Sequence, residues 1–405
     1  MKAGAAESIK DYALGIYDGP HATPQESAEG AVFLGIKNIT DDGRLDFSEI
    51  RHVSEDDMPR WTRRVTPSPG DVVFTYEATL HRYAIIPEGF RGCLGRRVAL
   101  IRPDPKKANS RFLLYYFLSH EWRKVIEGNV ISGATVDRIP LERFPDFPAR
   151  IPKLPIQERV ADVLSTYDDL IENNRRRMAL LEESARLLYQ EWFVRLRFPG
   201  HEHTPIANGL PEGWVRKTLG EVADFRLGKM LDQNKNKGEL MPYLANVNVR
   251  WGAIDLDNLR EMRFEDNELD TVGLRYGDIV MCEGGEPGRC ALWKEQLTRM
   301  MIQKAIHRIR AHPEVSCLFL YYCLRYKGQS GQLASLFTGA TIKHLPREKL
   351  AMVQVDIPPV PLVMLFAEQV DSLEKQSTLL EAANKRASLA RNLLLPRLMS
   401  GEIAV

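Results

Sequence analysis

The feature that most constrains the fold is a long stretch, Gln157–Leu196, that contains neither glycine nor proline. Mostly apolar residues recur in it at alternating steps of three and four, at Val160, Leu164, Tyr167, Ile171, Asn174, Met178, Leu181, Ala185, Leu188 and Trp192. This spacing is typical of a helix that packs lengthwise against another helix. Pro155 precedes the stretch and Pro199-Gly200 follows it, as expected at helix boundaries. The stretch therefore predicts a helix of about 36 residues, about 54 Å long.

A second stretch near the end of the chain repeats the spacing. Its seam positions are Leu362, Phe366, Val370, Leu373, Ser377, Leu380, Asn384, Ala387, Arg391, Leu394 and Leu398. Polar residues at such positions, here Ser377, Asn384 and Arg391, cost stability and fix the register. Pro396 predicts that regular helix ends near Leu395. We expect the two helices to pack as an antiparallel pair; one long core helix within a single large domain is the alternative.

The chain outside the helices is also repeated. A shift of 206 residues places Ser132-Gly133-Ala134-Thr135 on Thr338-Gly339-Ala340-Thr341, and Leu114-Tyr115-Tyr116 on Leu320-Tyr321-Tyr322. Shifts of 207 and 210 place Gly70-Asp71 on Gly277-Asp278, and Phe33–Ile39 on Tyr243–Val249. A slowly drifting offset is what insertions in loops produce. The chain is therefore one module written twice.

This repeat predicts an α/β (α+β) fold with a pseudo-two-fold internal repeat. Two similar globular domains, residues 1–150 and 198–356, would be separated by two long antiparallel coiled-coil-like helices, residues 151–197 and 357–405. Within the first globular domain, aromatic and apolar residues at helical spacing predict one helix over Arg111–Ile126.

Composition narrows the class of protein. A hydrophobic content of 44% and a charged content of 27% are ordinary for a globular domain. The five cysteines show no Cys-x-x-Cys spacing, which suits a reducing cytoplasm. No apolar signal segment opens the chain, and no run approaches the roughly 18 apolar residues of a membrane span. The net charge of +1 does not by itself indicate nucleic-acid binding, so any positive field must be local or come from other subunits.

The motifs of several enzymes are missing. Gly228-Lys229 is followed by Met230 rather than by the Ser or Thr of a phosphate-binding loop, and the glycine-rich loop Glu283–Arg289 has no lysine. Pro358-Pro359 follows Ile357, which does not match the Asn/Asp-Pro-Pro-Tyr/Phe pattern of DNA amino-methyltransferases. His201-x-His203 lies in a Pro/Gly-rich linker without a nearby cysteine, which favours a solvated loop over a metal site. We expect no catalytic residue and no metal site in this chain.

The order of domain, helix, domain, helix resembles the specificity subunit of type I restriction–modification enzymes. The stretches that carry the resemblance are Asp18–Pro24, Ile151–Arg159, Gly209–Trp214, the twin Ser/Thr-Gly-Ala-Thr loops and Pro396–Glu402. The resemblance covers nearly the whole chain. One departure is Leu362-Val363-Met364, where the second copy lacks the Gln157-Glu158-Arg159 that opens the first helix.

The resemblance implies a DNA-binding, non-catalytic specificity subunit. Each globular domain would be a target recognition domain that reads one half of a bipartite duplex target. The helix pair would set the gap between the half-sites and dock two methyltransferase subunits, with two restriction/translocase subunits joining for cleavage. S-adenosylmethionine, ATP and Mg would be bound by those partners and none by this chain, and the complex would work in a prokaryotic cytoplasm.

Candidates for DNA contact are polar and basic residues in loops at matching positions of the two halves. Sequence is read at base edges, with Arg on guanine and Asn or Gln on adenine, while phosphate contacts position the protein. In the first half the candidates are Lys37, Asn38, Arg60, Arg63, Arg64, Tyr76, Thr79, Arg82 and Thr135. In the second half they are Lys229, Lys235, Asn248, Arg250, Arg289, Thr341, Lys343 and His344. Each could equally be a solvated surface residue.

Within these candidates, Arg63 and Arg64 belong to the densest basic cluster of the first half, so we expect them to contact phosphates. The rival interpretation is a two-headed scaffold that binds a ligand other than DNA, which the near-zero net charge favours slightly. Salt-sensitive binding to duplex DNA distinguishes the two interpretations. A self-sufficient enzyme is a third possibility, which the missing motifs oppose.

Overall fold

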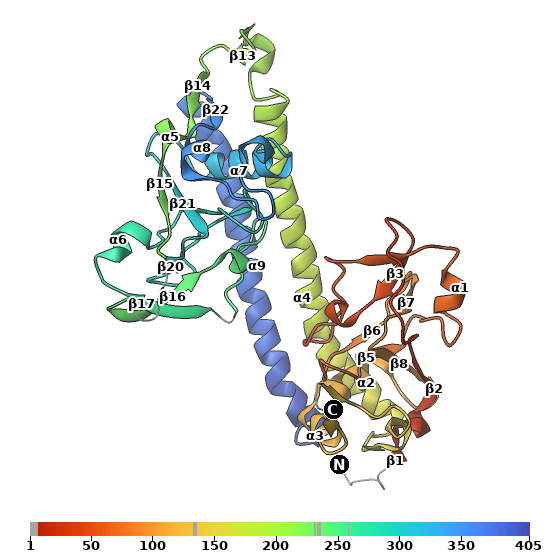
Figure 1. The fold of residues 1–405 in the computed structure, drawn as a ribbon. Helices are drawn as coiled ribbons and strands as arrows, with labels where there is room; N and C mark the ends of the chain where they lie inside the picture. Colours follow the sequence, from red (N-terminus) through yellow and green to blue (C-terminus); the bar gives the residue numbers. More distant parts are fainter. Residues whose placement is uncertain (1–6, 133–135, 231, 233–235, 258) are drawn as a thin grey trace. The chain divides into compact units, whose positions relative to one another are not determined.

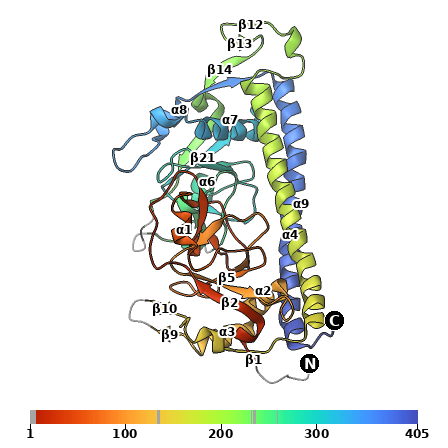
Figure 2. The same ribbon diagram turned by 90° about the vertical axis from the view of Figure 1, so that its right-hand side faces the viewer.

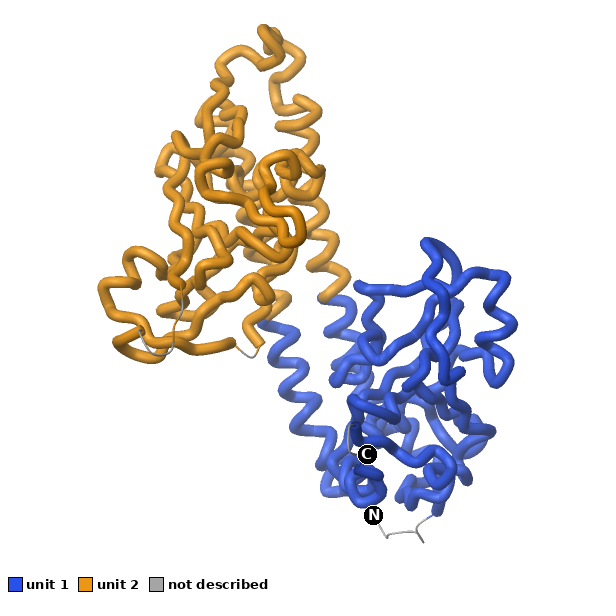
Figure 3. Tube along the Cα trace, viewed as in Figure 1, with its two compact units in different colours: residues 1–174, 382–405 blue, residues 175–381 orange. Residues whose placement is uncertain are grey.

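The computed structural model describes residues 7–132, 136–230, 232, 236–257 and 259–405. It divides into two compact units (Figure 3): unit 1 contains residues 1–174 and 382–405, and unit 2 contains residues 175–381. Each unit therefore includes part of both long helices. The predicted boundaries at 150/151, 197/198 and 356/357 treat the helices as separate segments and stay a prediction.

Unit 1 is built on two small sheets (Figure 1). The four-stranded sheet has the order β2 (Ala13–Asp18), β8 (Val98–Pro103), β5 (Val72–Thr75) and β6 (Tyr83–Ile85). The three-stranded sheet has the order β4 (Arg51–Val53), β3 (Ala31–Leu34) and β7 (Gly92–Leu94), with β3 and β7 parallel. Two-stranded pairs are β1 (Glu7–Ser8) with β11 (Pro148–Ala149), and β9 (Ile131–Ser132) with β10 (Asp137–Arg138).

The helices of unit 1 begin at polar side chains that cap them. Short α1 is Met58–Trp61, and the sheet packs against α2 (Ser110–Leu118). Asn109 accepts a bond from the backbone N–H of Phe112 at the start of α2. Ser119 does the same for Trp122 at the start of α3 (His120–Glu127), and its extended backbone separates the two helices. The single helix predicted over Arg111–Ile126 is therefore wrong, because a cap residue interrupts it.

Unit 2 repeats the topology of the two larger sheets. Its four-stranded sheet has the order β15 (Ala223–Leu227), β21 (Ile306–Ala311), β18 (Ile279–Cys282) and β19 (Cys290–Leu292). Its three-stranded sheet has the order β17 (Arg260–Phe264), β16 (Glu239–Leu244) and β20 (Met301–Ile302), again with one parallel pair. Two-stranded pairs are β14 (Val215–Thr218) with β22 (Gln354–Ile357), and β12 (Ile206–Ala207) with β13 (Leu210–Pro211). Its helices are α5 (Leu219–Val222), α6 (Glu268–Val272), α7 (Cys317–Gln329) and α8 (Arg347–Ala351).

The same buried ion pair holds both four-stranded sheets. In unit 1, Arg102 of β8 donates to both carboxylate oxygens of Asp71, at 2.9 and 2.7 Å. In unit 2, Arg310 of β21 does so to Asp278, at 2.7 Å each. Both carboxylates are almost completely buried and also accept a backbone N–H of the turn before them. The aligned Gly-Asp dipeptides are thus equivalent in three dimensions.

The two long helices are α4 (Leu154–Tyr189), followed by a π-helical turn over Gln190–Val194, and α9 (Val360–Ser400). The beginning of α4 shares the core of unit 1 with the end of α9, through Val160, Leu164 and Leu398. The end of α4 shares the core of unit 2 with the beginning of α9, through Ala185 and Phe366. Within each unit the two helices are therefore antiparallel neighbours (Figures 1 and 2), and α7 of unit 2 lies against them (Figure 2).

The seam residues lie on the buried sides of the two helices, and polar residues on or beside the seam bond between the helices. All the predicted seam positions are buried or half-buried, at Val160, Leu164, Tyr167, Ile171, Met178, Leu181, Leu188, Phe366, Val370, Leu373, Leu380 and Leu394. Asn174 donates its amide N–H to the amide oxygen of Asn384 at 2.9 Å. Arg391 donates to Asp168 at 2.5 Å.

The predicted end of the second helix near Leu395 is wrong. Helix α9 runs to Ser400 with Pro396 inside it. Proline removes one hydrogen bond, and near a helix end that loss is offset because the following turn buries Leu398 and Met399 in the core of unit 1. None of the helices in the described part of the chain is long and apolar enough to cross a membrane.

Candidate nucleic-acid interface

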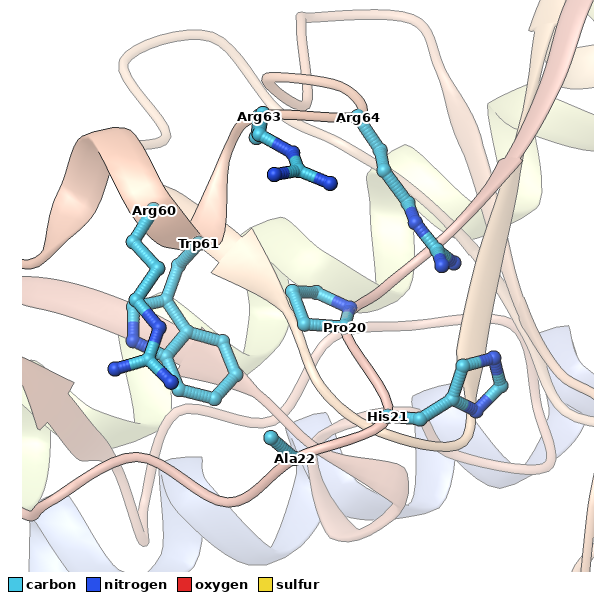
Figure 4. Close-up of a pocket in the computed structure, with 7 residues that line it drawn as sticks. All are labelled: Pro20, His21, Ala22, Arg60, Trp61, Arg63 and Arg64. Carbon is cyan, nitrogen blue, oxygen red and sulfur yellow. The ribbon is translucent and has the colours of Figure 1, made fainter.

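Three arginines gather around a pocket on unit 1 (Figure 4). The pocket has a volume of about 380 Å³ and is lined by Pro20, His21, Ala22, Arg60, Trp61, Arg63 and Arg64. Its floor is the loop that follows β2, and its wall is α1 with the turn after it. These two segments are separate in the sequence, and the three-stranded and four-stranded sheets bring them together.

The loop after β2 is fixed by close backbone packing. Gly19 donates its N–H to the carbonyl of Val98 at 3.1 Å. A Cβ at this position would lie 2.5 Å from the carbonyl oxygen of Gly95, so only glycine fits. On the other side of the pocket, the Trp61 ring is 4% exposed and meets the Phe33 ring edge to face at 5.7 Å. Both walls of the pocket are therefore rigid.

The charges of the pocket are only partly compensated. Asp18 pairs with Arg64, and one of its oxygens lies 2.9 Å from Nε2 of His21. Arg60 and Arg63 are exposed, and no ion pair within the described part of the chain involves either of them. Guanidinium groups present planar forks of N–H donors that match carboxylate or phosphate oxygens. The pocket can therefore hold an anion, with Arg60 and Arg63 as the available donors.

Unit 2 carries a corresponding loop with a different rim. Gly228 follows β15 as Gly19 follows β2, it donates to the carbonyl of Ile306 at 3.0 Å, and a Cβ there would lie 2.3 Å from the carbonyl oxygen of Gln303. The next residue, Lys229, pairs with Glu268 of α6 at 2.6 Å and lies over the Phe264 ring at 5.3 Å from its centre. The candidate Lys229 is thus already bound within the unit.

Known proteins are similar to this chain in sequence and in fold. A family model described as the type I restriction modification DNA specificity domain matches residues 30–183. The type I restriction enzyme MjaIX specificity subunit of Methanocaldococcus jannaschii is 23% identical over 376 residues, which cover 88% of this chain and 82% of that protein. The HindI specificity subunit of Haemophilus influenzae is 20% identical over 372 residues, covering 75% and 80%. Residues 30–183 thus match the model of that specificity domain, and the chain as a whole is similar to type I restriction enzyme specificity subunits.

A solved structure shares the architecture of this chain. The crystal structure of the S subunit of a type I restriction–modification system from M. genitalium matches 98% of this chain and 96% of its own, with a TM-score of 0.52 and 16% sequence identity. At that identity the similarity concerns the fold. The fold, mixed helix and sheet with long helices, agrees with the class expected from the sequence.

Two predicted base readers lie inside the fold. The Asn38 amide donates to the carbonyl of Asp46 at 2.9 Å and accepts the N–H of Gly35 at 3.0 Å. Asn248 makes the equivalent contacts in unit 2, accepting the N–H of Ala245 at 2.9 Å and donating to Asp255 at 3.2 Å. These asparagines hold the turns after β3 and β16, and a role in reading bases stays a prediction.

Other candidates of unit 1 are divided between the interior and the surface. Tyr76 is buried and donates to the carbonyl of Arg96 at 2.8 Å, and burial raises its pKa to about 12. Arg82 donates to the carbonyls of Ile36 and Ile39. Lys37 is exposed, 3.6 Å from Glu49, and Thr79 is half-buried. Thr135 lies outside the described residues.

The remaining candidates of unit 2 show the same division. Arg289 is 8% exposed, pairs with Glu286 at 2.8 Å and donates to the carbonyl of Asn246 at 3.0 Å. Arg250, Thr341 and Lys343 are exposed. The last two lie on a hairpin that His344 closes, through paired backbone bonds with Thr338 and a 3.1 Å contact with Glu283. Lys235 lies outside the described residues.

Sequence reasoning did not select the loop residues Asp18, Pro20, His21 and Ala22 as part of the site. The signal was present, because Asp18–Pro24 was among the stretches that carry the family resemblance. Among the residues that the structure describes, no group of three or more His, Cys, Asp or Glu side chains is placed to hold a metal ion.

Proposed function

We propose that this chain specifies the DNA sequence recognised by a type I restriction–modification system. Each unit would read one half of a bipartite duplex target. The observation that carries the proposal is the repeat of one four-stranded and one three-stranded sheet in both units, with different side chains around the equivalent loops. Two similar folds with different rims suit two different half-sites, because base edges are read by the side chains that reach the grooves.

The chain would contribute recognition without catalysis. We infer that the helix pair formed by α4 and α9 separates two target recognition domains, sets the gap between the half-sites and docks two methyltransferase subunits. Two restriction/translocase subunits would join that complex, and S-adenosylmethionine, ATP and Mg would be bound by the partners. Similarity to type I restriction enzyme specificity subunits of prokaryotes supports a specificity role of this kind in a prokaryotic cell.

Sequencing of methylated sites tests the proposal. Cells that contain the methyltransferase partner would be compared with and without this chain. We expect methylation at one bipartite sequence with a fixed gap, only in cells that contain the chain. Methylation that does not depend on the chain would favour the two-headed scaffold. So would tight binding of a small ligand by a chain whose binding to duplex DNA does not depend on salt.

A further inference from the structure

The two units differ in sequence at the loops that follow β2 and β15. These loops are equivalent, because Gly19 and Gly228 make the same backbone bond and the same close approach to the turn after the third strand of the small sheet. Beyond the glycine, unit 1 continues with Pro20 and His21, whereas unit 2 continues with Lys229 and Met230. The wall opposite is α1 in unit 1 and α6 in unit 2.

The two units also differ in which basic residues around these loops form ion pairs. In unit 1, Arg60 and Arg63 are exposed without an ion pair in the described part of the chain, and only Arg64 is paired, with Asp18. Two of the three acidic residues before α1 are engaged elsewhere: Glu55 pairs with Arg91, and Asp57 accepts the Ser54 hydroxyl at 3.2 Å.

In unit 2, three basic residues near the loop have acidic partners on or beside α6. Lys229 pairs with Glu268 at 2.6 Å, Arg275 with Asp270 at 2.8 Å, and Arg299 with Asp266 at 2.7 Å. Arg275 follows α6 in the chain, as Arg63 follows α1. Three basic side chains at this surface of unit 2 are therefore committed to carboxylates, whereas Arg60 and Arg63 of unit 1 are not.

We propose that the pocket of unit 1 binds a phosphate of the DNA backbone through Arg60 and Arg63, and that the equivalent surface of unit 2 binds none. The two half-sites are then held unequally, with unit 1 as the electrostatic anchor. This inference rests on the proposed function, because it assumes that the ligand is duplex DNA. It replaces the expectation of an Arg63 and Arg64 pair, since the structure commits Arg64 to Asp18.

The physical reason lies in the local balance of charge. Three guanidinium groups around one pocket repel each other, and Asp18 compensates only one of them. A phosphodiester relieves that repulsion and accepts the planar donor forks. The buried Trp61 and the tightly packed Gly19 hold the pocket walls in place, so little ordering is needed on binding.

Salt-dependent binding tests the inference with the full-length chain and a short duplex of mixed sequence. Each lost phosphate contact lowers the slope of log affinity against log salt by about 0.9. We expect this change for Arg60→Ala/Arg63→Ala. The matched control, Arg275→Ala/Arg299→Ala, removes the same number of charges from unit 2 and should leave the slope unchanged. Thermal unfolding of each variant checks that the chain is folded.

The outcomes separate the pocket from the proposed function. An unchanged slope for the unit 1 variant, with DNA bound by the folded protein, would overturn the pocket and leave the proposed function standing. Equal losses of slope in both variants would overturn the asymmetry. If the wild-type chain binds no duplex even at low salt, the pocket and the proposed function fall together.

Discussion

Units 1 and 2 share a scaffold, but different side chains hold the short helix that lies between the two sheets' strands in sequence: α1 in unit 1 and α6 in unit 2. Short α1 of unit 1 is held by the apolar Trp61 ring against Phe33. In unit 2, the buried Arg308 instead donates to the carbonyl of Gly273, at the end of α6, at 2.9 Å. Strand pairing shows the exchange: Leu100 lies opposite Tyr17 in unit 1, and Arg308 lies opposite Arg226 at the same place in unit 2. The comparison teaches that the scaffold constrains the strands and leaves their rim residues free to differ.

Breaking the shared ion pair should give the largest effect. Arg102→Ala leaves Asp71 buried without its partner, and Arg310→Ala leaves Asp278 in the same position. We expect each change to cost about 3 kcal/mol of stability, because an uncompensated buried carboxylate is expensive. Hydrogen exchange of the peptides that contain β5 and β18 measures the loss in each unit separately. A loss in one unit without a comparable loss in the other would contradict the equivalence of the scaffolds.

The rim anchors should respond differently to replacement. Trp61→Ala removes a buried ring from unit 1 and should cost about 3 kcal/mol. Arg308→Leu copies Leu100 of unit 1 and should change stability little, because exchanging a buried charged group for a packed apolar one is often neutral. Urea denaturation followed by hydrogen exchange compares the two variants. A larger loss for Arg308→Leu than for Trp61→Ala would show that the polar anchor of α6 is the stronger one.

A smaller, pH-dependent difference should come from His307, whose counterpart on β8 is Ala99. Burial lowers the pKa of His307 below its ordinary value of 6.5, while Nε2 lies 2.8 Å from the carbonyl oxygen of Leu345. An unfolded chain then takes up the proton first, so this stability is present above pH 6.5 and is lost as the pH falls through the lowered pKa.

His307→Gln keeps an N–H donor for Leu345 and removes the titration. From pH 7.5 to pH 5.5, we expect the free energy of opening of β21, obtained from exchange rates corrected for the intrinsic rate at each pH, to fall less in the variant than in the wild type. The two pH values lie about one unit either side of the ordinary pKa. Burial also lowers the pKa of His81, which precedes β6 in unit 1, so β6 should keep its own pH dependence in both proteins. An identical response of β21 in variant and wild type would show that His307 is not the cause.

Periodicity and repetition predicted the fold because both are properties of the chain itself. The seams place Val160 and Phe366 in the cores, and the aligned Gly-Asp dipeptides mark the same ion-paired turn. The break at Ser119 and the helical turn beyond Pro396 were missed, because a capping hydroxyl and the burial of Leu398 decide them.

The candidate site was harder to predict because a loop position does not reveal what a polar side chain contacts. Asn38 and Arg289 look like base readers in the sequence, yet each is bonded to nearby backbone carbonyls. Arg60 and Arg63, selected as candidates for DNA contact, line one pocket, and that contact stays a prediction. His21 joins them only through the packing of the loop after β2.

The most direct test of the account exchanges one head and sequences the methylated sites. Residues 1–150 would be replaced by the corresponding part of a type I restriction enzyme specificity subunit, with the rest of the chain and the proposed partners unchanged. Because each unit is a complete copy of the scaffold with its own rim, the account predicts that one half-site changes while the other half-site and the gap are retained. A change in both half-sites, or in neither, would contradict it.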